Sequence, residues 1–127
     1  MSEYKRIRIL VVDDDKTTTG VIRTLLERIG QYSVQVENEP ESVMNAARDF
    51  QPDLILLDVM MPEKDGHQLA AELRTVPALS RIPIVFVTAL ISAAEEGLRG
   101  GEHYLSKPVN PLALIETVGS RLTSQAA

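Results

Sequence analysis

The chain has 127 residues, of which 44% are hydrophobic and 24% are charged, and these values fit one domain over residues 1–127, with a core of about 6–123 and a short disordered C-terminal tail. Its formal net charge of −5 argues against direct binding to nucleic acid or to anionic membrane surfaces, because both favour basic patches. Cysteine is absent, which excludes disulfide and thiol chemistry and fits a cytoplasmic location. No apolar run is long enough for insertion into a membrane, and residues 9–12 are too few for a signal peptide.

Short β-branched runs alternate along the chain with stretches of helical periodicity, which is typical of strand–helix units around a parallel sheet. In chain order, strands are expected over residues 7–12, 32–36, 54–57, 84–87 and 103–105. Helices are expected to follow them over about residues 16–29, from Pro40 onward, after Asp65-Gly66, over residues 91–99 and from Pro111 onward. The run 54–57 is apolar without interruption, so the third strand should be buried on both faces.

The last two strand–helix units are less regular than the first three. Segment 91–99 is short and contains Gly97, and Gly100 and Gly101 follow it, so the fourth helix should be brief and weak and should end at this glycine pair. Asn110 as N-cap and Pro111 at the first helical position predict the start of the last helix.

Five such units with helices on both faces predict a doubly wound α/β fold, (βα)5, with a five-stranded parallel sheet in the flavodoxin-like order 2-1-3-4-5. Ligands in such sheets bind beyond the carboxyl ends of the strands, where the winding direction reverses. Functional side chains are therefore expected at the ends of the first and third strands.

Polar side chains follow four of the five predicted strands. They are Asp13, Asp14 and Asp15 after the first strand, Asp58 after the third, Thr88 after the fourth and Lys107 after the fifth. Adjacent strands lie about 4.8 Å apart, so Asp13 or Asp14 can approach Asp58. Clustered carboxylates favour a cation, and oxygen ligands without histidine or cysteine favour Mg²⁺. A carboxylate beside Mg²⁺ can attack phosphorus, and Lys107 and Thr88 would complete such a site by charge and hydrogen bonding.

Four segments at these strand ends resemble the CheY-like receiver domains of two-component response regulators. They read I-L-V-V-D-D-D, L-I-L-L-D-V-M-M-P-E-K-D-G, V-F-V-T-A and Y-L-S-K-P, and the resemblance covers essentially the whole chain. It implies a response regulator that accepts a phosphoryl group from a histidine kinase or a phosphotransfer protein. It also implies no catalysis beyond the protein's own phosphorylation and dephosphorylation, and a signal that leaves by contact with a downstream protein in trans.

The resemblance implies a role for each residue of the site. The phosphoacceptor is Asp58, and the Mg²⁺ ligands are Asp13, Asp14, Asp58 and the backbone carbonyl of Met60, whereas Asp15 falls outside the metal site. Thr88 and Lys107 contact the phosphoryl group, and Thr88 and Tyr104 form the switch. The bond between Lys107 and Pro108 is implied to be cis.

Two features depart from the family pattern. Fewer residues separate Thr88 from Lys107 than in similar receivers, by about one helical turn, so the output face around the fourth helix is expected to be altered or partly disordered. Met60 and Leu90 are apolar at positions where related domains tune hydrolysis. We expect slow self-dephosphorylation, because neither side chain can orient an attacking water.

Two other functions are compatible with the sequence. The D-x-D pattern of residues 13–15 also occurs in small phosphatases of the haloacid-dehalogenase type, with Asp13 as the nucleophile, although the chain has little room for a substrate cap. The other is an interaction module that keeps the fold without being phosphorylated.

His67 and His103 lack the spacing of metal ligands, so they are expected in surface or packing roles.

Overall fold

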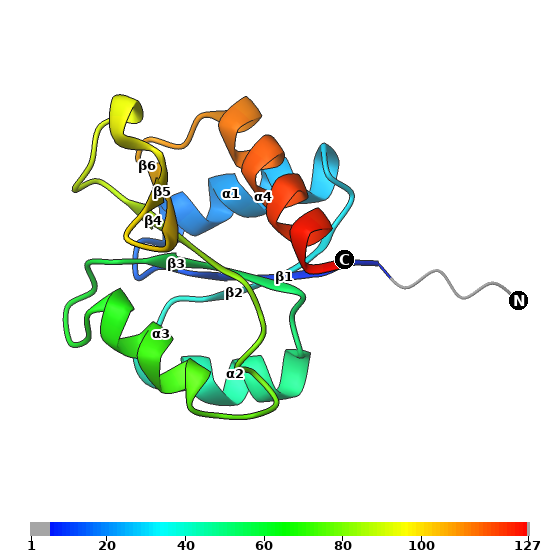
Figure 1. The fold of residues 1–127 in the computed structure, drawn as a ribbon, viewed down its shortest axis with the longest axis vertical. Helices are drawn as coiled ribbons and strands as arrows, with labels where there is room; N and C mark the ends of the chain where they lie inside the picture. Colours follow the sequence, from blue (N-terminus) through cyan, green and yellow to red (C-terminus); the bar gives the residue numbers. More distant parts are fainter. Residues whose placement is uncertain (1–5, 127) are drawn as a thin grey trace, which may run out of the picture.

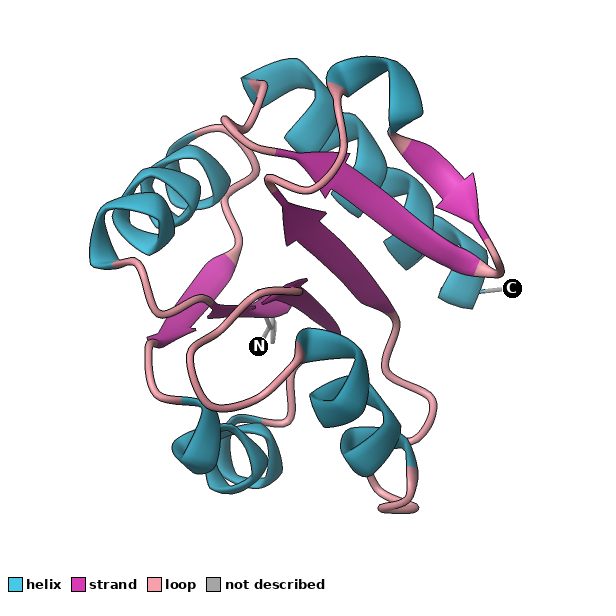
Figure 2. Ribbon diagram, turned by 90° about the vertical axis from the view of Figure 1, so that its left-hand side faces the viewer, coloured by secondary structure: helices cyan, strands magenta, loops and turns pink. Residues whose placement is uncertain are grey.

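The computed structural model describes residues 6–126, which form a sheet between two layers of helices (Figures 1 and 2). The elements are β1 (Arg8–Val12), α1 (Lys16–Arg28), β2 (Ser33–Glu37), η1 (Pro40–Ser42), α2 (Val43–Phe50), β3 (Leu54–Asp58), α3 (Gly66–Arg74), β4 (Ile84–Thr88), η2 (Ala93–Glu95), β5 (Gly97–Arg99), β6 (Glu102–Ser106) and α4 (Pro111–Ala126). Figure 1 shows α2 and α3 on one face of the sheet and α1 and α4 on the other.

The strands are arranged in the order β2-β1-β3-β4-β6-β5. The first five strands of this order pair in parallel, whereas β5 pairs with β6 in the antiparallel direction. The structure therefore confirms the predicted doubly wound fold and the order 2-1-3-4-5, with β6 as the predicted fifth strand. It adds a short edge strand that the sequence did not predict.

Alternate residues of the central strands contribute to two separate hydrophobic clusters, one under each helical layer. The cluster under α2 and α3 includes Leu10, Val12, Ile55, Leu57 and Phe86, and the cluster under α1 and α4 includes Ile9, Val11, Leu54, Leu56 and Val85. Because a slip of one residue would exchange the two faces of a strand, this packing fixes the register of β1, β3 and β4. It also places the carboxyl ends of these strands at one rim of the sheet.

The expected helix over residues 91–99 is wrong. The structure has the single turn η2 there, followed by a hairpin in which Arg99 of β5 pairs with Glu102 of β6 (Figure 2). The two residues between them, Gly100 and Gly101, have φ values of 57° and 85°, the left-handed region that two-residue hairpin turns need. The glycine pair is thus a turn between two strands and not the end of a helix.

The last helix begins as predicted, because the Asn110 carboxamide oxygen accepts a hydrogen bond from the Ala113 N–H at 3.0 Å. It continues to Ala126, past residue 123, where the disordered tail was expected to begin, and residue 127 lies outside the described residues. None of the helices within residues 6–126 has the length and apolar character that a membrane span requires.

Candidate functional site

The carboxyl ends of β1, β3, β4 and β6 bring four of the predicted side chains together. Asp13 follows β1, Asp58 and Thr88 end β3 and β4, and Lys107 follows β6. Asp13, Asp58 and Thr88 are 3%, 4% and 1% exposed, so these polar groups are almost entirely removed from water. Buried polar side chains of this kind need partners, and the site supplies them.

Three carboxylates form the acidic part of the site. Carboxylate oxygens of Asp13, Asp14 and Asp58 all lie within 4.8 Å of one another, and Asp14 is the exposed member. Burial and, to a smaller extent, the neighbouring charge of Asp13 together raise the pKa of Asp58 to about 6, while Lys107 acts in the opposite direction. Asp58 is therefore ionised at neutral pH, but less readily than an ordinary carboxylate.

Lys107 provides the positive charge of the site. Its Nζ lies 2.6 Å from Asp13 Oδ2 and 3.4 Å from Asp58 Oδ1. Burial alone would lower the pKa of Lys107, but the charges and hydrogen bonds of Asp13 and Asp58 outweigh it and raise this pKa. One ammonium group faces three carboxylates, so the site retains excess negative charge when all of them are ionised.

Asn38 supports Asp13 and was missed by the sequence interpretation. Its Nδ2 donates to the Asp13 carbonyl oxygen at 2.7 Å and lies 3.1 Å from the Thr19 hydroxyl oxygen. The Asp13 carboxylate in turn accepts a hydrogen bond from the Asp15 N–H at 2.9 Å. The signal in the sequence was a polar residue directly after the second strand, in a sheet whose other strands also end in polar groups.

The loop between β3 and α3 folds back onto the end of β3. The Gly66 N–H donates to the Val59 carbonyl at 2.7 Å, and a Cβ atom at position 66 would overlap the carbonyl oxygen of Asp58. Only glycine permits this approach. The Met60 N–H lies 3.4 Å from Asp58 Oδ1, so the loop also contacts the central carboxylate directly.

Thr88 and Tyr104 lie on the neighbouring strands β4 and β6. The Thr88 hydroxyl oxygen accepts a hydrogen bond from the Leu90 N–H at 3.1 Å. The Tyr104 ring stacks on Phe86, with ring centroids 5.3 Å apart, and its hydroxyl lies 2.6 Å from Nε2 of His67. The expected packing role of His67 is thus confirmed by its contact with Phe86, at 4.5 Å between ring centroids, whereas its contact with Tyr104 was not foreseen.

The described residues fit a hard divalent cation. The cluster offers three carboxylates with oxygen atoms close together, and the single positive charge of Lys107 beside them does not balance three negative charges. Asp13, Asp14 and Asp58 are the residues that could hold such an ion.

The peptide bond between Lys107 and Pro108 is cis, as the resemblance implied.

A flavodoxin-like sheet with a lysine-paired acidic cluster at the carboxyl ends of its strands defines the class of receiver domains. The response regulator receiver domain family matches residues 9–119. The chain is 34% identical over 117 residues to the polar-differentiation response regulator DivK of Brucella anthropi, which corresponds to 90% of this chain and 94% of that protein.

Solved structures agree with this result. The receiver domain of Francisella response regulator 1452 is 30% identical, with a TM-score of 0.77 and coverage of 93% of this chain and 98% of that chain. A CheY-like receiver domain protein of Methanospirillum hungatei is 25% identical, with a TM-score of 0.80 and coverage of 96% and 98%. The chain belongs to the response regulator receiver domain family of two-component signalling.

Proposed function

We propose that the protein is a phosphorylation-activated response regulator that accepts a phosphoryl group on Asp58. The observation that carries this proposal is the position of Asp58, a carboxylate 4% exposed that lies beside both an acidic pair and Lys107. The phosphodonor is a histidine kinase or a phosphotransfer protein, and the activated protein signals by contact with a downstream protein in trans. Apart from its own phosphorylation and dephosphorylation, we propose no enzymatic activity.

The ionised carboxylate of Asp58 is the nucleophile. One of its oxygens attacks the phosphorus of a phosphohistidine; the P–N bond breaks as the new P–O bond forms, and the imidazole nitrogen keeps the electron pair. Lys107, 3.4 Å from Asp58 Oδ1, is placed to pair with the transferred group. A pKa of about 6 leaves Asp58 largely ionised at neutral pH, so no separate base is needed.

Asp13, Asp14 and Asp58, together with the backbone carbonyl of Met60, would hold Mg²⁺. When bound, Mg²⁺ supplies positive charge that offsets the oxygens of the phosphoryl group. The residues of the chain position the nucleophile and exclude water around it, as the burial of Asp13 and Asp58 indicates.

The signal begins with Thr88 and continues to Tyr104. The Thr88 hydroxyl accepts a bond from the Leu90 N–H and can therefore donate its own hydrogen to a phosphoryl oxygen. Inward movement of Thr88 and Tyr104 would follow, because the phosphorylated protein gains contacts only in that state. The exposed side chains Leu98 on the hairpin and Leu112 at the start of α4 would be available to a downstream partner.

The phosphodonor can approach beside α1. A small cavity of about 140 Å³ lies between α1 and the loop after β6 and is lined by residues that include Thr18, Val21, Lys107 and Pro108. Val21 is 51% exposed, so it offers an apolar contact next to Lys107. A partner that docks here has its phosphohistidine within reach of Asp58.

Intact-mass measurement with Mg²⁺ and acetyl phosphate tests the proposal. We expect one phosphoryl adduct on the wild type and none on Asp58→Asn or with EDTA. Asp49→Asn is the matched control, because Asp49 is an exposed carboxylate of α2, and it should behave as the wild type.

The two alternative functions give different results in the same measurement. An adduct that survives Asp58→Asn but disappears in Asp13→Asn would support the phosphatase with Asp13 as nucleophile. No adduct under any condition, including incubation with a cognate kinase, would support the phosphorylation-independent interaction module. The hairpin in place of a helix is the feature that favours this second alternative.

A further inference from the structure

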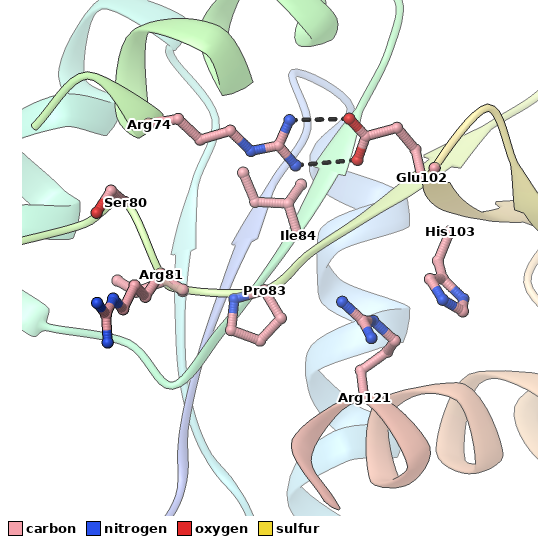
Figure 3. Close-up of a pocket in the computed structure, with 10 residues that line it drawn as sticks. Arg74, Ser80, Arg81, Pro83, Ile84, Glu102, His103 and Arg121 are labelled. Carbon is pink, nitrogen blue, oxygen red and sulfur yellow. Dashed lines mark hydrogen bonds and ion pairs between the residues drawn. The ribbon is translucent and has the colours of Figure 1, made fainter. Parts of the chain in front are cut away.

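A second polar pocket lies at the amino ends of the strands, whereas Asp58 lies at their carboxyl ends (Figure 3). Its volume is about 290 Å³, and it is formed at the amino ends of β4 and β6 by the segment before β4, the hairpin turn and α4. Ile84 lines this pocket and Thr88 lines the acidic site, and these two residues are the first and last of β4, a five-residue strand. At about 3.3 Å per residue, the two sites are about 13 Å apart.

The pocket carries uncompensated positive charge in a chain whose net charge is −5. Its lining contains three arginines and one glutamate. Arg74 and Glu102 compensate each other through two parallel bonds of 2.8 and 2.9 Å, which Figure 3 shows as dashed lines. Within residues 6–126, neither Arg81 nor Arg121 forms an ion pair. Figure 3 shows the guanidinium of Arg81 directed away from Arg121, beyond Pro83, so Arg121 carries the positive charge that is available to a ligand in the pocket.

Arg121 has a side-chain donor without a hydrogen-bond acceptor within residues 6–126. Its Nε is buried, and no group in the described part of the chain accepts a hydrogen bond from it. Figure 3 shows its side chain extending from α4 towards the space between Pro83 and His103. A buried donor of a charged group without an acceptor is costly, so an acceptor from outside the chain is expected at this position.

We propose that this pocket binds a phosphate-type anion, either inorganic phosphate or the phosphate group of a small metabolite. A guanidinium group presents parallel N–H donors that match the oxygens of phosphate, and the guanidinium of Arg121 forms no ion pair among the described residues. Pockets for small ligands begin at about 300 Å³, so this pocket suits a phosphate with a small attached group. The site is independent of Asp58 and does not rest on phosphorylation of the protein.

Residue-resolved ¹H–¹⁵N NMR of the wild-type chain tests the proposal, in EDTA and at constant ionic strength of about 0.15 M. The probes are inorganic phosphate and adenosine 5′-monophosphate. We expect saturable shifts of the Arg121 Nε–H signal and of the amides of Gly101, Glu102 and His103, with little change at Asp13 and Lys107. Tighter binding of the nucleotide would identify a phosphate ester as the ligand, and equal binding would identify phosphate itself.

Arg121→Gln should weaken binding about tenfold or more, because a hydrogen bond between charged groups is lost. Arg121→Lys keeps the positive charge but lacks the parallel N–H donors of arginine, so it should also weaken binding and serves if Arg121→Gln does not fold. Arg48→Gln, an exposed arginine of α2, is the matched control and should bind as the wild type. Shifts that fail to saturate, that are the same in all variants or that centre on Lys107 would overturn the proposal.

Discussion

The acidic end of the sheet and the hairpin at its edge are built in different ways. Asp13, Asp58 and Thr88 are at most 4% exposed and follow strands whose registers are fixed by two hydrophobic layers. The hairpin is at the edge of the sheet, and Leu98 of β5 is 65% exposed. The acidic end therefore depends on the core, whereas the hairpin depends on its glycine turn and on pairing with β6 at the edge of the sheet.

Lys107 links the two regions, and its contacts show which of them determines its position. Its backbone N–H donates to the Thr88 carbonyl at 3.0 Å, and its ammonium group contacts Asp13 at 2.6 Å. Both contacts are to the buried end of the sheet. Strand pairing thus places Lys107 at the site although no α-helix lies between β4 and β6. Changes at the strand ends should disable the site, and changes in the hairpin should leave it intact.

The largest effect is expected from Gly66→Ala. A Cβ atom there meets the backbone of Asp58 and Val59, which cannot move without shifting the nucleophile. We expect a loss of about 3 kcal/mol in the free energy of unfolding, measured with urea, and loss of phosphorylation of Asp58. Gly119→Ala, in α4 with open space around it, should gain up to about 1 kcal/mol. Wild-type stability in Gly66→Ala would show that the loop does not constrain Asp58.

Asp58→Asn should stabilise the protein in a pH-dependent manner. The pKa of Asp58 is raised from 3.8 to about 6, so within this window the folded chain holds a proton that the unfolded chain has lost. Stability contributed by this group therefore falls as the pH rises from 3.8 towards 6. The substitution removes that loss, and we expect a gain of about 1–2 kcal/mol near pH 7.5 that shrinks towards pH 4.5.

Urea unfolding at both pH values, without Mg²⁺, measures this gain. Asp49→Asn, which removes an exposed carboxylate of α2, is the control. An equal gain at both pH values would mean that ionisation of Asp58 is not its cause.

The buried parts of the protein could be predicted from the sequence because hydrophobic periodicity reports burial directly. The central strands, their order and the meeting of Asp13, Asp58, Thr88 and Lys107 follow from that pattern and from the rules for parallel sheets. The sequence shows Asn38 as a polar residue after the second strand, but its contact with Asp13 depends on how the chain turns after β2.

The hairpin was mistaken for a helix because its glycines are compatible with two structures. Gly100-Gly101 is a stop signal after a helix and also a two-residue turn between strands. Tertiary pairing decides between them, since β6 is fixed by β4 and offers its other edge to β5. The contact of His67 with Tyr104 also joins segments that are distant in the sequence, so no local pattern predicts it.

The rate of self-dephosphorylation tests the role of Met60 and Leu90, two side chains at the rim of the site. Met60 and Leu90 are both 61% exposed and apolar, so neither can hold a water for attack on the phosphoryl group. The double variant Met60→Asn/Leu90→Glu should release phosphate about tenfold faster than the wild type, measured after removal of acetyl phosphate. Leu98→Glu places the same charge on the exposed hairpin and should leave the rate unchanged. A double variant no faster than the wild type would show that these side chains do not limit hydrolysis.

The smallest effect is expected in the hairpin turn. Gly100 has a φ of 57°, so Gly100→Ala should cost about 1 kcal/mol, whereas Gly100→Asn should cost less because asparagine tolerates left-handed backbone. Faster hydrogen exchange in Gly100→Ala should be confined to the amides of β5 and β6. Phosphorylation of Asp58 should persist in both variants, because Lys107 is held by Thr88 and Asp13. If Gly100→Ala abolished phosphorylation, the hairpin would be part of the site and the independence of the two regions would be wrong.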